Sequence, residues 1–321
     1  MPWSVAAHWA AQGAEQLSST DRALLFAVSF VAFLVLPTLM LPRGLAAATF
    51  LILGWELTLK AYSYVVEPGS RRINLKGCLF YLLVDPTVVF PMRARPAARN
   101  VPSGASAGRF AAGMVCMALA LAASHPIELG LAHLATSAAG GGLAMTMAQG
   151  VGRLLVAYGK QSGLASMQIG LMRLLGYDLQ ERFKYPLLSR DPADFWRRWN
   201  TYIGQWARRY LFSPLALMSA RSEHRALQTV GTGCSVVAVF VAMGLYHDAL
   251  TWFSARAFSF QGLALFGANG LLVVAWVGIA RVVMRPSSED GSRHGSAFRT
   301  GEFARRTTFA IIFLWLIGAL T

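Results

Sequence analysis

Long apolar runs separated by short polar stretches dominate the pattern of this chain. Several of these runs hold about 20 residues, the length of helix that crosses a hydrocarbon core of about 30 Å. The pattern therefore predicts an all-α, polytopic integral membrane protein. The expected spans cover residues 23–42, 45–66, 110–124, 141–158, 227–246, 264–284 and 307–320.

Three further apolar runs, at 78–91, 126–138 and 163–176, are shorter or are interrupted by Pro and Gly. Non-helical backbone at membrane depth is tolerated where protein or water satisfies its polar groups. We therefore expect these runs to form re-entrant or tilted segments.

The remaining stretches add no second domain to this pattern. The first 22 residues carry Trp3, His8 and Trp9 and are expected to form an interfacial segment without a cleavable signal peptide. The Ser-, Gly- and Arg-rich stretch 286–302 is expected to be a polar loop. A single membrane-embedded domain over residues 1–321 is predicted.

Composition supports this class and affects how the net positive charge is interpreted. Hydrophobic residues make up 55% of the chain, charged residues only 14%, and the mean hydropathy is +0.46. A net charge of +14 would suggest nucleic acid in a soluble protein. Here the Lys and Arg residues cluster between apolar spans, as they do in cytoplasmic loops of multi-pass proteins. We expect a multi-pass protein of a bacterial inner membrane that binds no nucleic acid.

The three cysteines carry no recognisable site chemistry. Cys78, Cys116 and Cys234 lie in apolar runs and have no paired spacing. We expect buried, reduced packing residues, with no disulfide and no metal site.

The segment 181–215 combines aromatic and basic residues at helical spacing. Asp191 and Pro192 are a helix-start signal. On one continuous helix, an arc of about 100° would form an apolar face at a membrane interface. Asn200 would project from the edge of that face, which a plain interfacial anchor does not require. The residues of the arc are Phe195, Trp199, Tyr202, Ile203, Trp206 and Tyr210.

His247 stands out among the six histidines because apolar residues precede and follow it. A polar, ionisable group at membrane depth is unfavourable and is by default a candidate functional residue. The alternative is a hydrogen bond between helices. His8, His125, His133, His224 and His294 lie in polar stretches or at the ends of apolar runs.

Two motifs together resemble the membrane-bound O-acyltransferase (MBOAT) family. They are YPLLSRDPADFWRRWNTYIGQWARRYLFSPL, from Tyr185, and AMGLYHDALTW, from Ala242. The text FYLLVDPT, from Phe80, also resembles an aromatic-rich segment of the family. The resemblance covers residues 177–253, the predicted catalytic motif region. It implies an MBOAT-like bundle of about seven to nine transmembrane helices with re-entrant and interfacial helices.

The resemblance leaves two branches of the family open. The Phe-Trp-Arg-Arg-Trp text is similar to bacterial polysaccharide O-acetyltransferases, whereas Asn200 and the chain length resemble wax synthase-like members. Tyr246 and Asp248 beside the histidine match neither branch cleanly. The acceptor can therefore be a lipid alcohol or a glycan.

The family resemblance also implies a mechanism. His247 would act as general base on the acceptor hydroxyl, which attacks an acyl-CoA thioester, and a neutral imidazole can accept that proton. Asn200 would donate from its amide to the developing oxyanion. No nucleophilic Ser elbow or paired Cys is evident, so no acyl-enzyme and no permanently bound cofactor are expected.

The anionic head of CoA would need cations, and lipid-headgroup anchoring is the alternative explanation for each of them. A protein partner that presents the acceptor is compatible with this interpretation. The candidate residues for CoA or substrate are Trp196, Arg197, Arg198, Trp199, Arg208 and Arg209, with Lys160 and Lys184 as further cations.

A non-enzymatic membrane transporter or scaffold that kept the fold is the alternative of a different class. A transporter should show repeated halves with broken helices and several charges at membrane depth. The sequence has Glu56, Lys60 and Asp85 as such charges but no internal repeat. We expect these three residues to pair with one another or to line a tunnel.

Overall fold

A computed structural model describes residues 45–67, 75–89, 95–96, 103–137, 142–175, 177–255, 257–283, 309 and 312–313. The predicted interfacial segment 1–22, the span 23–42 and the loop 286–302 lie outside the described residues, as does most of the span 307–320.

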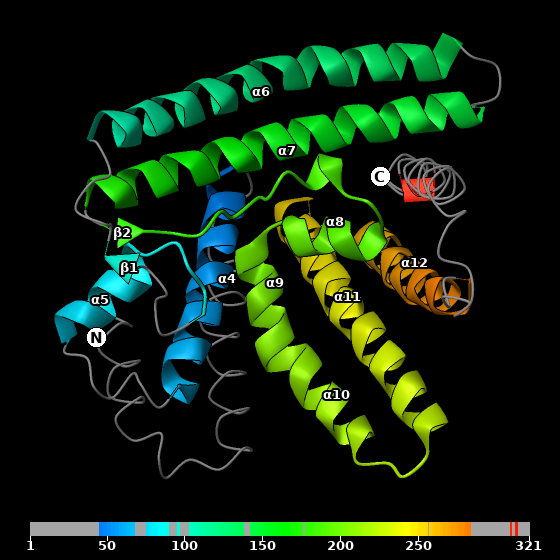
Figure 1. Cartoon of the computed structure of the whole chain (residues 1–321). Helices are drawn as coiled ribbons and strands as arrows, with labels where there is room; N and C mark the ends of the chain where they lie inside the picture. The colour runs from blue at the N-terminus through cyan, green and yellow to red at the C-terminus, as the bar shows by residue number, and fades with distance from the viewer. Residues whose placement is uncertain are drawn as a thin grey trace, which may run out of the picture. The chain divides into compact units, whose positions relative to one another are not determined.

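Apart from one pair of two-residue strands, the described elements are helical, which confirms the all-α class (Figure 1). β1 (Arg95–Pro96) pairs antiparallel with β2 (Tyr177–Asp178). Two short elements, the 3₁₀ helix η3 (Pro186–Leu188) and the π-helix η4 (Arg208–Phe212), flank the central helices. The α-helices are α4 (Leu45–Val66), α5 (Leu75–Leu83), α6 (Ser103–Ser137), α7 (Leu143–Leu174), α8 (Pro192–Arg198), α9 (Thr201–Ala207), α10 (Ser213–Ala220), α11 (Arg225–Ala255) and α12 (Gln261–Val283).

Each of two compact units is assembled from segments that are distant in sequence. The first unit contains Met1–Asn100, Leu175–Gln180 and Tyr246–Ser259. The second contains Val101–Leu174, Glu181–Leu245 and Phe260–Thr321. The helix α11 contributes residues to both units. A single membrane-embedded domain over residues 1–321 stays a prediction.

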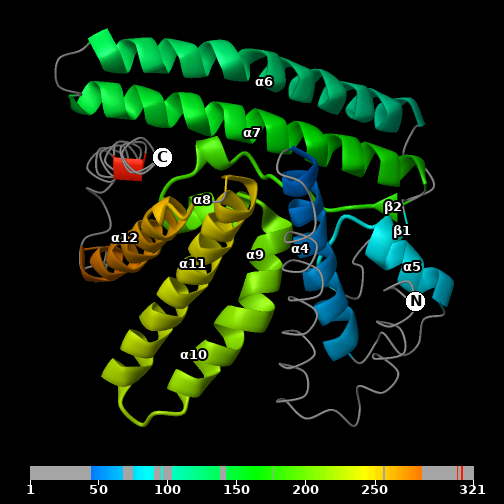
Figure 2. The same ribbon diagram turned by 180° about the vertical axis from the view of Figure 1, so that it is seen from behind.

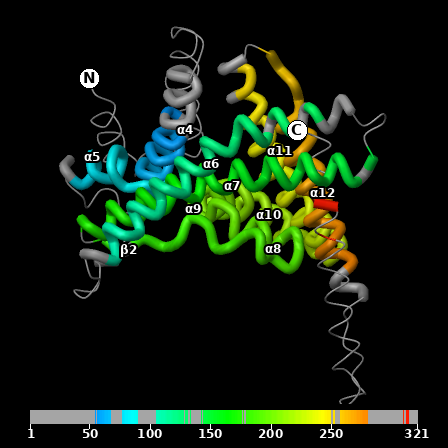
Figure 3. The backbone as a smooth tube through the Cα atoms, turned by 90° about the horizontal axis from the view of Figure 1, so that it is seen from above, coloured from blue at the N-terminus to red at the C-terminus, as the bar shows by residue number. Residues whose placement is uncertain are grey.

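In the second unit, α6 and α7 run alongside each other over most of their length (Figures 1 and 3). Glycines permit this close approach. A Cβ atom added at Gly113 would lie 2.7 Å from the backbone nitrogen of Met167, and one at Gly163 would lie 2.7 Å from that of Met117. Close backbone approach through small residues is how helices associate where lipid removes the hydrophobic driving force.

An aromatic cluster joins α8 to α7 and α12 in the second unit. Phe195 of α8 packs with Leu154 of α7 and with Phe309 and Phe313 near the C-terminus. The short α8 also contacts α12. Seen from behind, α10 lies beside the N-terminal part of α11 (Figure 2), where a Cβ atom at Gly231 would clash with Ser219. The aromatic cluster thus holds the central segment against the long helices.

In the first unit, α4 holds the end of α5 through a buried lysine. Lys60 Nζ donates to the carbonyl of Leu82 at 3.2 Å and to that of Asp85. The Asp85 carboxylate accepts instead from Thr87, at 2.9 Å from its backbone N–H and 2.8 Å from its hydroxyl. Lys60 thus contacts the backbone of Asp85, and pairing between the two charged groups stays a prediction. Glu56 is half-buried on α4.

Three of the described helices are long and apolar enough to cross a membrane: Ala105–Ile127, Arg225–Ala249 and Gln261–Ile279. Their exposed apolar surfaces are typical of a chain with lipid as its solvent. The chain is thus a membrane protein. The expected number of about seven to nine spans stays a prediction.

Two boundaries expected from the sequence are wrong. Residues 126–138 continue the preceding span within the 35-residue helix α6, which passes through Pro126. The Ser124 hydroxyl donates to the Leu121 carbonyl at 2.7 Å in the turn before this proline. Residues 163–176 largely belong to α7, which ends at Leu174 and continues helically through 159–162.

The cysteines also depart in part from expectation. Cys78 is buried, but Cys116 and Cys234 are exposed on α6 and α11. Both exposed thiols lie on candidate spans, and Cys116 Sγ donates to the Gly159 carbonyl of α7 at 3.6 Å. Burial was therefore the wrong prediction for these two residues.

Candidate active site

The central segment folds as two short helices with a corner at Asn200. The helix α8 ends at Arg198, and α9 begins at Thr201. Asn200 has φ 37° and ψ 64°, in the left-handed region that interrupts a right-handed helix. Asn enters this region more readily than other residues with a β-carbon. The prediction of one continuous amphipathic helix is therefore wrong, and its break falls at the residue singled out for chemistry.

The start of α8 is the one that the sequence predicted. Asp191 precedes the first turn, and its Oδ1 accepts a hydrogen bond from the backbone N–H of Asp194 at 2.8 Å. Pro192 occupies the first helical position, where the lack of an N–H group loses no hydrogen bond within the helix. The helix-start signal is confirmed.

Backbone hydrogen bonds tie the corner to the chain segment 181–184. The Thr201 N–H donates to the Arg182 carbonyl at 2.8 Å, and the Lys184 N–H donates to the Arg198 carbonyl at 2.9 Å. The Thr201 hydroxyl donates to the Glu181 carbonyl at 2.7 Å. These bonds satisfy groups that the helix ends leave open. The corner is therefore part of a hydrogen-bonded unit rather than a loop.

The side chain of Asn200 contacts a cation from that same segment. Arg182 Nε donates to Asn200 Oδ1 at 3.1 Å, and Arg182 Nη1 donates to Gln168 Oε1 on α7 at 3.2 Å. The Arg182 guanidinium also lies over the Tyr202 ring, 5.7 Å from its centroid. Asn200 itself is partly exposed. An arginine that sequence reasoning missed thus holds the amide.

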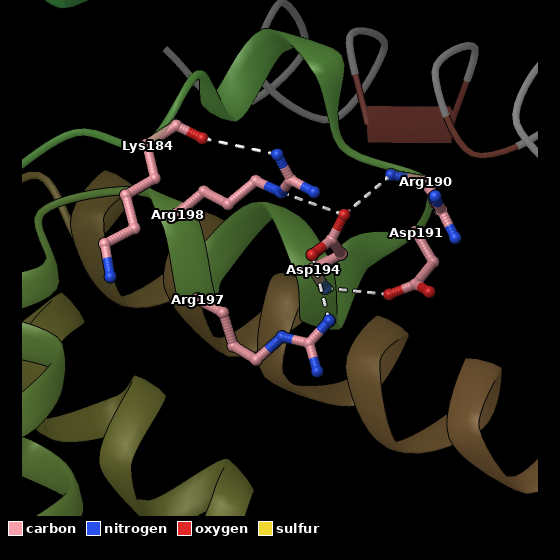
Figure 4. A network of polar contacts seen from close by, with 6 residues as sticks. All are labelled: Lys184, Arg190, Asp191, Asp194, Arg197 and Arg198. Atoms are coloured by element: carbon pink, nitrogen blue, oxygen red, sulfur yellow. Dashed lines mark hydrogen bonds and ion pairs between the residues drawn. The ribbon is translucent and has the colours of Figure 1, made fainter.

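Figure 4 shows how Asp194 gathers the two arginines of α8. Arg197 Nη2 donates to Asp194 Oδ1 at 2.9 Å, and Arg198 Nε forms an ion pair with Asp194 Oδ2 at 3.0 Å. The Arg190 N–H donates to Asp194 Oδ2 at 3.1 Å. Arg198 also reaches the Lys184 carbonyl at 3.4 Å. Arg197 and Arg198, two of the predicted CoA contacts, therefore already have an anionic partner.

These contacts determine the charge state of Asp194. Burial disfavours its carboxylate, but contacts to Arg198, Arg197 and the Arg190 backbone outweigh burial and hold its pKa at about 2. Asp194 is thus ionised at neutral pH and neutralises part of the basic cluster.

The tryptophans of α8 and of the corner pack with aromatic rings. Trp199 stacks on Phe195 with ring centroids 5.4 Å apart, and Trp196 meets Phe240 and Phe266 at 5.2 and 5.5 Å. Such contacts are ordinary core packing. A role for Trp196 or Trp199 beside CoA stays a prediction.

The basic residues after α9 are arranged differently from those of α8. Arg208 and Arg209 are exposed at the start of η4, where Arg209 lies over the Tyr210 ring at 5.9 Å. A π-helical turn widens a helix locally and often occurs at functional sites. Both arginines are exposed, in contrast to the half-buried Arg198 of α8. Lys184 is also exposed, whereas Lys160 is half-buried on α7.

His247 and its neighbours lie in the C-terminal part of α11. The His247 side chain is exposed, whereas Asp248 is fully buried, because successive side chains project about 100° apart on a helix. The apolar residues that precede and follow His247 in sequence therefore do not cover its side chain, and its place at membrane depth stays a prediction. The His247 ring contacts the Tyr246 ring edge to face at 5.1 Å. In the same motif, a Cβ atom at Gly244 would lie 2.7 Å from Leu263 Cα, so this glycine serves helix packing.

The two candidate catalytic residues belong to different compact units. Asn200 lies in the second unit with the four candidate arginines and both tryptophans, and His247 lies in the first. Convergence of Asn200 and His247 stays a prediction. No group of three or more His, Cys, Asp or Glu residues suited to a metal ion occurs within the described part of the chain.

Comparison with known proteins gives several acyltransferases as relatives. A probable alginate O-acetylase of Pseudomonas syringae is 41% identical over 128 residues, covering 36% of this chain and 25% of that protein. A probable long-chain-alcohol O-fatty-acyltransferase of Arabidopsis thaliana is 30% identical over 123 residues, covering 37% and 34%. A teichoic acid D-alanyltransferase of Streptococcus thermophilus is 24% identical over 104 residues, covering 32% and 25%. No protein-family model matches the chain.

All three relatives belong to one family. This chain is a relative of the membrane-bound O-acyltransferases. The resemblance inferred from its two motifs is thereby confirmed. The matched segments span only about a quarter to a third of each relative's length. Both branches that the MBOAT motifs suggested, glycan O-acetylation and acylation of long-chain alcohols, are represented among the names.

Proposed function

We propose that the chain is an acyl-CoA-dependent O-acyltransferase that acylates a hydroxyl of a lipid alcohol or a glycan. The observation that carries this proposal is the corner at Asn200. Asn200 presents an amide whose oxygen is already bound by Arg182, in a relative of the MBOAT family. A fixed donor amide is the element that acyl transfer needs where negative charge develops.

The proposed reaction transfers the acyl group directly from CoA to the acceptor, in an addition step followed by an elimination step. The acceptor oxygen attacks the thioester carbonyl carbon, and a new C–O bond forms while His247 takes the hydroxyl proton. The resulting oxyanion collapses, the C–S bond breaks, and the thiolate of CoA receives that proton. The products are the ester and free CoA. No covalent enzyme intermediate takes part.

The role proposed for Asn200 follows from the chemistry of its amide. Because Oδ1 accepts from Arg182, Nδ2 is the end that can donate to a ligand. Removing one such donor to an oxyanion lowers kcat by about 10²–10³-fold. The left-handed backbone turns the side chain out of the regular helical pattern, which supports a role beyond packing.

His247 is proposed as the general base. Its imidazole is exposed, so an acceptor hydroxyl can reach it from outside the helix. General-base assistance contributes about 10²–10⁴-fold. The buried Asp248 in the next position distinguishes this end of α11 from a plain apolar span.

We assign the CoA phosphates to Arg208 and Arg209 before Arg197 and Arg198. The first pair is exposed on η4, whereas the second pair neutralises Asp194. Guanidinium groups bind phosphate through paired hydrogen bonds, and a cation already bound to a carboxylate offers fewer of them. Lys184, exposed nearby in sequence, is a further candidate for the same anion.

The decisive experiment is acyl transfer by the purified full chain in detergent. Labelled acetyl-CoA and palmitoyl-CoA are offered separately with hexadecanol and with alginate oligosaccharide, and CoA release and labelled ester are measured. We expect ester formation that requires an acceptor and that falls about 10²–10⁴-fold in His247→Ala.

The two acceptors also separate the family branches. Transfer of palmitate to hexadecanol supports the lipid-alcohol branch, and transfer of acetate to the oligosaccharide supports the glycan branch. Equal CoA release by the wild type and His247→Ala with every acceptor contradicts the proposed enzyme and favours a non-enzymatic membrane protein.

A further inference from the structure

We propose that Arg182 is a positioning residue that fixes and polarises the Asn200 amide for oxyanion binding. This inference rests on the proposed function of Asn200 as a donor. Arg182 Nε donates to Asn200 Oδ1 at 3.1 Å, so the two side chains are in direct contact. Arg182 acts on the reaction through Asn200 and not through the substrate.

The contact decides which end of the amide faces a ligand. The guanidinium group has only donors, so the Asn200 atom that meets it must be the carbonyl oxygen. The amide NH₂ then points to the other side. Within the part of the chain that the structure describes, Asn200 Oδ1 is the only side-chain atom of this residue with a hydrogen-bond partner. Arg182 therefore selects the rotamer in which Nδ2 is offered as a donor.

The arginine is itself held from neighbouring elements. Its Nη1 donates to Gln168 of α7 at 3.2 Å, its guanidinium lies over the Tyr202 ring of α9, and its carbonyl accepts from the Thr201 N–H. Together with the contact to Asn200, these interactions hold both the side chain and the backbone of Arg182, which therefore loses little further freedom when a ligand binds. The network thus preorganises Asn200 before acyl-CoA arrives.

A fixed positive charge at Oδ1 also strengthens the opposite end of the amide. Hydrogen bonds in series polarise one another in a protein interior, so a cation at the carbonyl oxygen makes the N–H groups better donors. Both effects act when the oxyanion forms. We therefore expect Arg182 to support kcat rather than acyl-CoA binding.

A purely architectural role for Arg182 predicts a different outcome, and the chain contains a matched comparison. Arg109 of α6 forms an ion pair with Glu181, the residue next to Arg182, rather than with Asn200. Arg109→Met thus removes a comparable contact between a long helix and the same segment. If Arg182 only fixes this segment to its neighbours, Arg182→Met and Arg109→Met should have similar consequences.

The test is a double-mutant cycle on the full chain in the acyl-transfer assay. Arg182→Met, Gln168→Ala and Arg109→Met are each made in the wild type and in Asn200→Gly, and kcat, KM for acyl-CoA and the thermal midpoint are measured. In the wild type we expect Arg182→Met to lower kcat about 10-fold without changing KM. In Asn200→Gly the same substitution should have no further effect on kcat, because interacting residues are not additive.

The remaining variants distinguish a positioning role of Arg182 from a structural one. Gln168→Ala frees one side of the guanidinium and should lower kcat less than Arg182→Met, again only when Asn200 is present. If Arg182→Met does not fold, Gln168→Ala alone tests the positioning role. Arg109→Met should lower the thermal midpoint and leave kcat unchanged.

Equal kcat losses in both backgrounds, or a wild-type kcat for Arg182→Met or Gln168→Ala, overturn the positioning role. A wild-type kcat for Asn200→Gly instead overturns the proposed function of Asn200 itself. The two failures are therefore distinguishable.

Discussion

The corner at Asn200 and the C-terminal part of α11 hold their proposed catalytic side chains by different means. Asn200 sits between two short helices in a left-handed conformation and is bound by Arg182. His247 projects with an exposed side chain from an uninterrupted helix. A substitution at the corner therefore alters backbone and side chain together, whereas one at His247 alters mainly the side chain. The two residues need different variants to isolate their chemistry.

The largest expected effect is at His247. His247→Ala should lower kcat about 10²–10⁴-fold because it removes the general base. The thermal midpoint should stay close to that of the wild type, since Ala has the highest helix propensity. Acyl transfer and thermal unfolding of the detergent-solubilised protein measure the two quantities. His224→Ala, at an exposed position just before α11, is the matched control and should retain full kcat.

At the corner, two substitutions separate the side chain from the backbone. Asn200→Gly and Asn200→Ala should each lower kcat about 10²–10³-fold, because both remove the amide donor. Only Ala should also destabilise the fold, by about 1 kcal/mol, since its β-carbon opposes the positive φ that Gly adopts freely. Urea unfolding and kcat are the measurements. If Asn200→Ala is more stable than Asn200→Gly, the left-handed corner is wrong.

The comparison extends to the arginines that flank the corner. Arg208→Gln should raise KM for acyl-CoA about 5-fold with little change in kcat, because it removes a phosphate contact common to substrate and transition state. Arg197→Gln should raise KM less, since Asp194 already binds that guanidinium. Arg221→Gln, at an exposed position after α10, removes the same charge and serves as control. Equal KM values for the Arg208 and Arg197 variants would contradict the assignment.

The smallest effect concerns stability at acid pH. The pKa of Asp194 falls from its ordinary value of 3.8 to about 2, so the native state binds fewer protons than the unfolded state. The stabilisation, about 1–2 kcal/mol after allowance for the exposed Arg197, is complete above about pH 5 and is lost as pH falls towards 2. Asp194→Asn should therefore be less stable than the wild type at pH 6, and the difference should shrink by pH 3. Urea midpoints across this range test the prediction, and a pH-independent difference contradicts it.

The hydropathy pattern located the apolar helices more reliably than their ends. The range 45–66 coincides with α4 at Leu45–Val66, and 227–246 and 264–284 largely fall within α11 and α12. It divided α6 at Pro126 and α7 near Gly163 because both residues usually interrupt helices. In the structure, Pro126 is accommodated within α6 and Gly163 provides a close contact with α6.

The candidate site was only partly predictable. Asp191 and Pro192 correctly predicted the start of α8, and the two motifs indicated the relation to the MBOAT family. Nothing in the local pattern pointed to Arg182, because its partners Gln168 and Asn200 are 14 and 18 residues away along the chain. A contact of that kind depends on how α7, the 181–184 segment and the corner come together.

The sequence by itself determined the membrane class, most of the helices and the two motifs, because these depend on hydropathy and residue identity. The tertiary structure decided that the central segment turns at Asn200 and that Asp194 binds Arg197 and Arg198 while Arg208 and Arg209 remain exposed. It also brought Arg182 into contact with the Asn200 amide. The physical reason is that a left-handed residue and a hydrogen bond between segments are favourable only when neighbouring elements supply the partners.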